Sequence, residues 1–131
     1  MRVKTKIDLS GLQNLKKAFS QKKMAKVGIL GSGNAREGDQ TNAEIGLLHE
    51  FGSLDGTTIP ARSFLRMPVE NQQKQIAKAV LAKRRSIERA MAKGDMTFAY
   101  TQLGLAGEAA VQRAFASAGF GQWDPNEDST K

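Results

Sequence analysis

The stretch Asn42–Arg66, NAEIGLLHEFGSLDGTTIPARSFLR, carries the strongest local structural signals in the chain. Thr41 precedes it and Glu44 follows three positions later, which is the spacing of a capping box, so a helix is expected to begin at about Asn42. Gly52 is the residue type that ends a helix in the left-handed conformation. A helix of about ten residues is too short to persist alone in water. We therefore expect it to dock inward by its apolar stripe, which consists of Ile45, Leu48 and Phe51.

The second half of the stretch is a polar turn followed by a bulky apolar pair. Residues 53–58 are turn formers, and Pro60 holds Ile59 extended. Phe64 and Leu65 then follow, and two interpretations stay open for them: ordinary core packing, or an anchor that reaches a neighbouring subunit. In the second interpretation, Arg62 and Arg66 meet acidic residues of the neighbour, Glu44 or Glu50, which are expected near the rim with His49. The predicted interface set is Glu44, His49, Glu50, Phe51, Ile59, Pro60, Arg62, Phe64, Leu65 and Arg66.

The N-terminal third predicts two strands separated by a helix. Residues 3–7 alternate apolar and basic side chains, as a half-buried strand does, and the short apolar run Lys26–Leu30 is expected to pair with it. Between them, Ser10 and Gln13 have capping-box spacing, which predicts a helix to about Lys22. Its expected inner stripe is Leu9, Leu12, Leu15 and Phe19. The small polar segment Gly31–Gln40 is expected to form a loop.

The C-terminal half predicts a helical hairpin. Apolar residues recur at helical spacing from Pro68 to Lys93, which would make one helix of roughly 39 Å. Gly94 should end it and Asp95 should cap a second helix, residues 96–118, which Gly104 and Gly107 thin for a close partner. The predicted fold class is therefore α+β: a small antiparallel β-sheet packed with a long antiparallel helical hairpin and a short N-terminal helix. We expect one domain over residues 1–121 and an extended C-terminal tail over residues 122–131, anchored by Trp123.

The net charge of +7 is distributed unevenly along the chain. Residues 1–30 and 66–93 each carry eight Lys or Arg against one and two acids, whereas residues 31–65 and 94–131 each carry two against five. Such alternation suits stacking of basic faces on acidic ones, or a position near DNA, or simply a solvated surface. The residues that could face DNA lie on the predicted long helix: Lys74, Lys78, Lys83, Arg84, Arg85 and Arg89.

Motifs for catalysis, metals and cofactors are weak throughout. Gly31-Ser32-Gly33 lacks the third glycine of a nucleotide fingerprint, since Arg36 stands there. His49-Glu50 begins like a zinc-binding HExxH helix, but position 53 is serine and the chain has no other histidine and no cysteine. We therefore expect no catalytic, cofactor-binding or metal-binding residues, and no enzyme. No run of the sequence is apolar for long enough to predict a membrane span.

The pattern AEIGLLHEFG followed by IPARSFLR resembles the signature segment of the tail-completion and neck proteins of long-tailed bacteriophages, a group that includes the Mu-type virion-morphogenesis proteins. Residues 27–30, VGIL, and residues 122–126, QWDPN, also fit the pattern, which is tightest over roughly a fifth of the chain. The resemblance implies a head-tail joining protein without enzymatic activity, made in the host cytoplasm and located in the virion neck. It implies a ring of identical subunits between connector and tail proteins, with DNA passing through the lumen. Members of that group continue past a Trp-x-Pro segment, whereas this sequence stops at Lys131, so we expect either a sequence that ends early or a shortened member of the group.

Two other functions stay open. A DNA-binding accessory protein would use the six basic residues of the predicted long helix on phosphates, although few aromatic residues are available for stacking on bases. A tail terminator protein is the other alternative.

Overall fold

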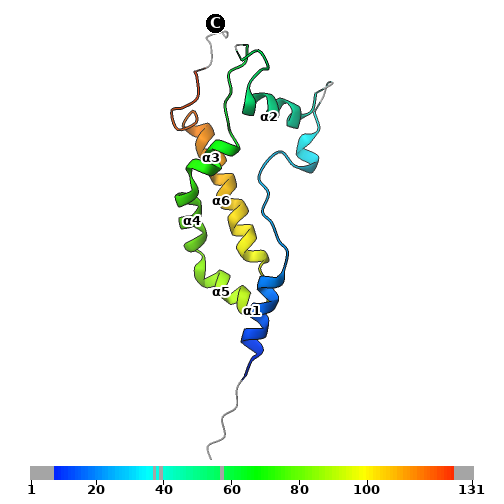
Figure 1. The fold of residues 1–131 in the computed structure, drawn as a ribbon, viewed down its shortest axis with the longest axis vertical. Helices are drawn as coiled ribbons and strands as arrows, with labels where there is room; N and C mark the ends of the chain where they lie inside the picture. Colours follow the sequence, from blue (N-terminus) through cyan, green and yellow to red (C-terminus); the bar gives the residue numbers. More distant parts are fainter. Residues whose placement is uncertain (1–7, 37, 39, 57, 126–131) are drawn as a thin grey trace, which may run out of the picture.

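The structure, a computed structural model, describes residues 8–36, 38, 40–56 and 58–125, and the regular secondary structure of these residues consists only of helices, joined by extended and turn segments (Figure 1). Its first elements are α1 (Ser10–Ser20), the short 3-10 helix η1 (Gly31–Asn34) and α2 (Asn42–Phe51). The C-terminal half holds α3 (Arg66–Asn71), α4 (Gln73–Leu81), α5 (Arg84–Ala92) and α6 (Thr97–Ala116). The described residues form no β-strand, so the predicted α+β class is wrong.

The predicted strand Lys26–Leu30 is an extended segment that runs alongside α6 (Figure 1). A strand needs a partner for its backbone hydrogen bonds, and the partner proposed for it, residues 3–7, lies outside the described residues. The segment packs against α6 by its side chains instead. Val27 lies so close to Gly107 that a Cβ added at this glycine would stand 2.9 Å from Val27 Cγ2. The prediction that Gly107 admits a close partner is thus confirmed, and that partner is this extended segment.

The predicted single helix over residues 68–93 is wrong in its continuity, because it is broken into α3, α4 and α5. The backbone leaves helical geometry at Gln72 (φ −105°, ψ 21°) and again at Lys83 (φ −100°, ψ 14°). The first two pieces pack along α6, while α5 bends across to contact α1 as well (Figure 1). The antiparallel hairpin itself is present. Gly94 (φ +81°) ends the first arm as predicted, and Asp95 accepts a hydrogen bond from Thr97 N at 2.8 Å where the second arm begins.

Helix α1 docks by a different side from the one that the sequence predicts. Its contacts with the body come from Asn14, whose Nδ2 donates to Ala92 O at 3.0 Å, from the fully buried Ala18, and from the next residue after the helix, Gln21. Gln21 donates to Gly94 O and accepts from Met96 N. The predicted inner stripe faces outward, with exposed fractions of 52% for Leu9, 65% for Leu12, 37% for Leu15 and 69% for Phe19. The predicted Ser10 cap is also wrong: Asp8 Oδ1 accepts from Ser10 N at 2.9 Å instead.

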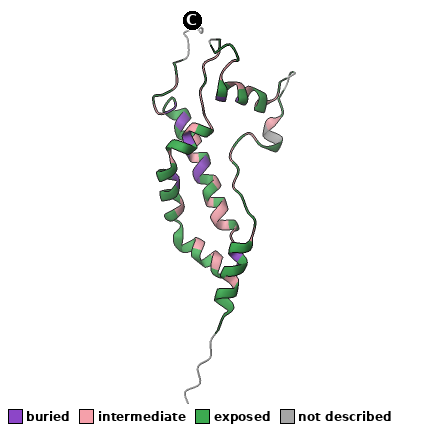
Figure 2. Cartoon of the chain, viewed as in Figure 1, coloured by how far each residue is buried: buried purple, intermediate pink, exposed green. Residues whose placement is uncertain are grey.

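The core is small for a chain of this length (Figure 2). Its central cluster is Ile76, Ala106 and Ala110, with Val80 packed against them between α4 and α6. The chain exposes 10561 Å², whereas a compact monomer of 14.2 kDa would expose about 6,800 Å². Counting the sixteen residues outside the described part as fully exposed, about 2,500 Å², still leaves about 8,000 Å². The described fold therefore exposes much more surface than a compact monomer does.

Candidate interaction site

Helix α2 begins and ends as the sequence predicts. Thr41 Oγ1 accepts from Glu44 N at 3.2 Å, and Glu44 Oε2 accepts from Thr41 N at 2.7 Å, which completes the capping box. At the other end, Gly52 has φ +76° and donates its N–H to Leu48 O at 2.7 Å. A Cβ at Gly52 would stand 2.9 Å from both Ala61 N and Ile59 O, so the returning chain also needs glycine there. The expected inward docking holds for Ile45 and Leu48, which are half-buried, but not for Phe51, which is 65% exposed.

Glu50, expected near the rim of α2, is instead buried, with 8% of its surface exposed. Its carboxylate accepts four hydrogen bonds: from Ser63 Oγ at 2.6 Å, Phe64 N at 2.8 Å, Leu65 N at 3.0 Å and Arg66 N at 3.1 Å. Three of these donors are backbone N–H groups at the start of α3, which lack partners within their own helix. Glu50 therefore joins two helices of one chain, and no oxygen of it is left for a neighbour's arginine.

The charge state of Glu50 follows from these contacts. Burial by itself raises the pKa of the carboxyl, but the hydrogen bonds from Ser63, Leu65, Arg66 and Phe64 outweigh it, and the pKa of Glu50 lies below its ordinary value of 4.5. The carboxylate is consequently ionised at neutral pH, which suits its position beside the positive end of α3.

The turn over residues 53–59 closes on itself. Ser53 N donates to Ile59 O at 3.0 Å, and Ile59 N donates to Ser53 Oγ at 3.0 Å. The Asp55 carboxylate accepts from the hydroxyls of Ser53 and Thr58. Leu54 in the same turn is fully exposed. The polar side chains of the turn thus bond within it, while its apolar side chain is left to solvent.

Phe64 packs within its own chain, as one of the two interpretations expects. Its ring lies 5.7 Å from that of Phe115 on α6, and Phe115 in turn lies 5.4 Å from Trp123, edge to face. Trp123 Nε1 donates to Ser63 O at 3.2 Å, so the tail folds back onto the residue beside Phe64. Gly119 makes this return possible, because a Cβ there would stand 2.3 Å from the indole ring. Trp123 therefore anchors the predicted tail as expected, after the turn at residues 117–122, and residues 126–131 of that tail lie outside the described residues.

Beside these aromatic rings lies a groove of about 740 Å³, between α2 and the turn that follows α6. Ile29, Ile45, Phe64, Phe115 and Trp123 give it apolar walls, and His49, Arg62 and Asp124 give it a polar edge. Arg62 is fixed across one end, where Nε donates to Asp124 O at 3.1 Å and Nη2 to Pro125 O at 3.3 Å. Small-ligand pockets span about 300–1,000 Å³, so this groove is large enough to take several apolar side chains.

The structure brings only part of the predicted interface set to the groove: His49, Arg62 and Phe64. Glu44 and Phe51 are exposed on α2, while Ile59, Pro60 and Leu65 are half-buried. Arg66 is exposed and lies 3.6 Å from Glu70 one turn further along α3. Ile29 and Phe115 line the groove but were absent from the prediction. Their apolar character alone gave no signal, because it fits the core equally well.

The six basic residues are exposed, and they are spread over two helices and the bend between them. Lys74 and Lys78 lie one turn apart on α4, Lys83 lies at the bend, and the three arginines lie on α5. Arg84 forms an ion pair with Glu88 at 3.3 Å. Because α4 and α5 are separate helices joined at the non-helical Lys83, the two groups do not form the single straight basic face that one long helix would give.

Within the described residues, no cluster of His, Asp or Glu could hold a metal ion. Among the same residues, no helix is both long and apolar enough to cross a membrane. No protein-family model, curated protein or solved structure matches the chain.

Proposed function

We propose that this chain is a structural subunit of the neck of a long-tailed phage, which completes the tail and joins it to the head connector as a ring. The observation that carries the proposal is the surface excess of the described fold. Even the lower figure, about 8,000 Å², exceeds the area expected of a compact monomer by more than the ~800 Å² that each partner buries in a standard interface. An assembly subunit has this property, because its apolar surface becomes buried in contacts with its neighbours.

The groove beside α2 supports the same proposal. Its apolar walls come from segments distant in sequence, and partly buried hydrogen bonds from Phe64 and Trp123 hold two of them in place, so the groove is a formed surface. Neither the groove nor its rim combines an acid, a base and a nucleophile, which favours binding over catalysis. The segment that resembles the neck proteins supplies one side of this groove.

The proposal is tested by electron microscopy of purified particles in which this protein carries an affinity label. Label at the junction of head and tail is expected, and label confined to the capsid shell or absent from particles would reject the neck assignment. Cells infected with a phage that lacks the gene should accumulate separate heads and tails. Joined particles in that strain would count against a joining role.

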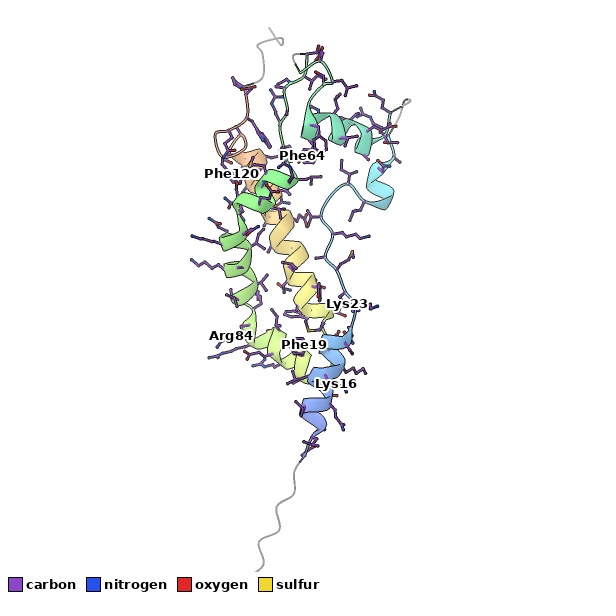
Figure 3. The ribbon with its side chains drawn as sticks, in the orientation of Figure 1. Lys16, Phe19, Lys23, Phe64, Arg84 and Phe120 are labelled. Atoms are coloured by element: carbon purple, nitrogen blue, oxygen red, sulfur yellow. The ribbon has the colours of Figure 1, made fainter. Side chains whose placement is uncertain are left out.

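A DNA-binding accessory role is the second candidate, because the six basic residues are all exposed and α1, which carries Lys16 and Lys17, packs against α5 (Figure 3). Phosphate contacts make affinity fall steeply with salt. Duplex binding measured at increasing salt should show that fall if the role is correct. Replacing Arg85 and Arg89 by Ser should flatten the slope, and absence of binding at low salt would remove this candidate.

A further inference from the structure

The two ends of the molecule carry complementary apolar features. At one end, α1 presents an apolar stripe to solvent, defined here as Leu9, Leu12, Leu15 and Phe19. At the other end lies the groove beside α2. Figure 3 places Phe19 of the stripe and Phe64 of the groove at opposite ends of the elongated chain. One copy therefore cannot fill its own groove with its own stripe.

The orientation of α1 is the strongest part of the case. With 3.6 residues per turn, the stripe lies about a third of a turn away from Asn14, Ala18 and Gln21, which hold the helix to the body. An amphipathic helix normally buries its apolar side. Here the side that docks is polar and small, and the apolar side remains without a partner in the described fold.

Charge favours the same pairing. Residues 8–26, which include α1, carry five lysines against Asp8. The region around the groove, residues 41–62 and 118–125, exposes Glu44, Asp55 and Asp124 against Arg62, while its fourth acid, Glu50, is buried. Opposite charge on two surfaces steers them together and disfavours pairing of like ends, so two α1 helices would repel one another.

We propose that the stripe of one copy binds the groove of the next copy, with Lys16 and Lys17 of α1 near the exposed carboxylates of the groove region, Glu44, Asp55 and Asp124. This inference rests on the proposed function for its biological setting, because a ring needs such a head-to-tail contact between subunits. The contact joins unlike surfaces, so an open chain of copies keeps one free stripe at one end and one free groove at the other until the ring closes. The surface excess, about 1,200 Å², is larger than the ~800 Å² that one partner buries in a contact of standard size.

The test uses two variants of the full chain, each with one defective surface. Phe19→Glu places a carboxylate in the stripe, and His49→Trp fills part of the groove; both residues are exposed, so the fold should persist. Native mass spectrometry should find the unmodified chain assembled. Each variant should be monomeric, with self-association weakened about thirtyfold or more. Gln13→Glu on α1 and Leu54→Glu on the turn are the matched controls, and both should assemble like the unmodified chain.

Mixing the two variants gives the decisive result. Phe19→Glu retains its groove and His49→Trp retains its stripe, so together they should form a one-to-one dimer that grows no further. A mixture that stays monomeric would overturn the proposal, as would an unmodified chain that is monomeric up to its solubility limit. Label at the neck without this dimer would reject the contact and leave the proposed function standing. Dimers without neck label would reject the function and leave the contact.

Discussion

The segment from Glu50 to Arg66 and helix α1 are both amphipathic, and they complete their contacts in opposite ways. Around Glu50, a buried carboxylate is fully used by donors of its own chain, and Phe64 packs on Phe115. In α1, the polar side makes the internal contacts and the apolar side stays exposed. The difference separates residues that stabilise the fold from residues available to a partner. Side-chain polarity alone would place the apolar residues of α1 in the fold and the carboxylate of Glu50 at a partner's surface, which is the reverse of what the structure has.

Glu50→Ala should produce the largest effect. It leaves the Ser63 hydroxyl and the N–H groups of Phe64, Leu65 and Arg66 without their acceptor, so a loss of about 3–5 kcal/mol in the free energy of unfolding is expected. Urea denaturation measures it. Glu44→Ala, which removes only the reciprocal bond of an exposed capping box, should cost about 1 kcal/mol. Equal losses in the two variants would contradict the claim that the buried carboxylate of Glu50 stabilises the fold more than the exposed capping box does.

Gly52→Ala should come next, with a loss of about 2–3 kcal/mol. The alanine would have to adopt φ +76°, which is strained for a residue with a side chain. Its Cβ would also stand 2.9 Å from two backbone atoms, Ala61 N and Ile59 O. Gly56→Ala is the control, since that glycine also has positive φ (+69°) but open space around it. It should lose only about 1 kcal/mol. Thermal unfolding of both variants measures the two losses. The difference between them is the part due to crowding of the new Cβ, because both alanines share the strain of positive φ.

Acid should weaken the fold through Glu50. Because its pKa is lower in the folded state than in the unfolded chain, its contribution is fully present above the ordinary value of 4.5. The contribution is lost as pH falls from that value through the lower pKa of the folded state. The pH dependence of unfolding should therefore be shallower in Glu50→Gln than in the unmodified chain between pH 5 and 3. If stability fell with pH equally in both proteins, Glu50 would not be the cause of the fall. Asp8 and Asp95 would then account for it, because hydrogen bonds from Ser10 and Thr97 also lower their pKa values.

Phe19→Ser should have the smallest effect on stability, within about 0.5 kcal/mol, although it removes a large aromatic side chain. The ring is 69% exposed in the isolated chain, so its removal deletes little packing. The measurement requires a concentration at which the chain is monomeric, because assembly would add linked stability. A loss as large as that of Gly52→Ala would place Phe19 in the core and remove the basis of the proposed contact.

Local signals in the sequence predicted local structure well. The capping box of Thr41 and Glu44, the stop at Gly52 and the hairpin turn at Gly94 each depend on residues within a few positions of one another. The Ser10 cap is a local prediction that was wrong, because Asp8 accepts from Ser10 N instead. The other errors arose where distant segments decide the outcome. Lys26–Leu30 looks like a strand, but the glycines of α6 let it pack as an extended segment. Periodicity from Pro68 to Lys93 gave no sign of the bends at Gln72 and Lys83 that carry α5 across to α1.

The candidate site shows the same limit. Glu50 was expected at the rim because a glutamate on a short helix usually is, and nothing near it in sequence indicates donors thirteen to sixteen residues later. The groove needs Ile29, Phe64, Phe115 and Trp123 to come together from four separate segments. No spacing rule connects such residues, so the groove could be found only in the folded chain.

The docking of α1 also bears on the order of folding. Its hydrogen bonds to the body span 73 to 78 residues, whereas those of Glu50 span 13 to 16. Closing a loop of 78 residues costs about 1.5 kcal/mol more entropy than closing one of 14. Helix α1 should therefore dock late and open first, and its amides should exchange with solvent before those of α4. A helix that can open on its own could deliver its apolar side to a neighbour while the rest of the chain stays folded.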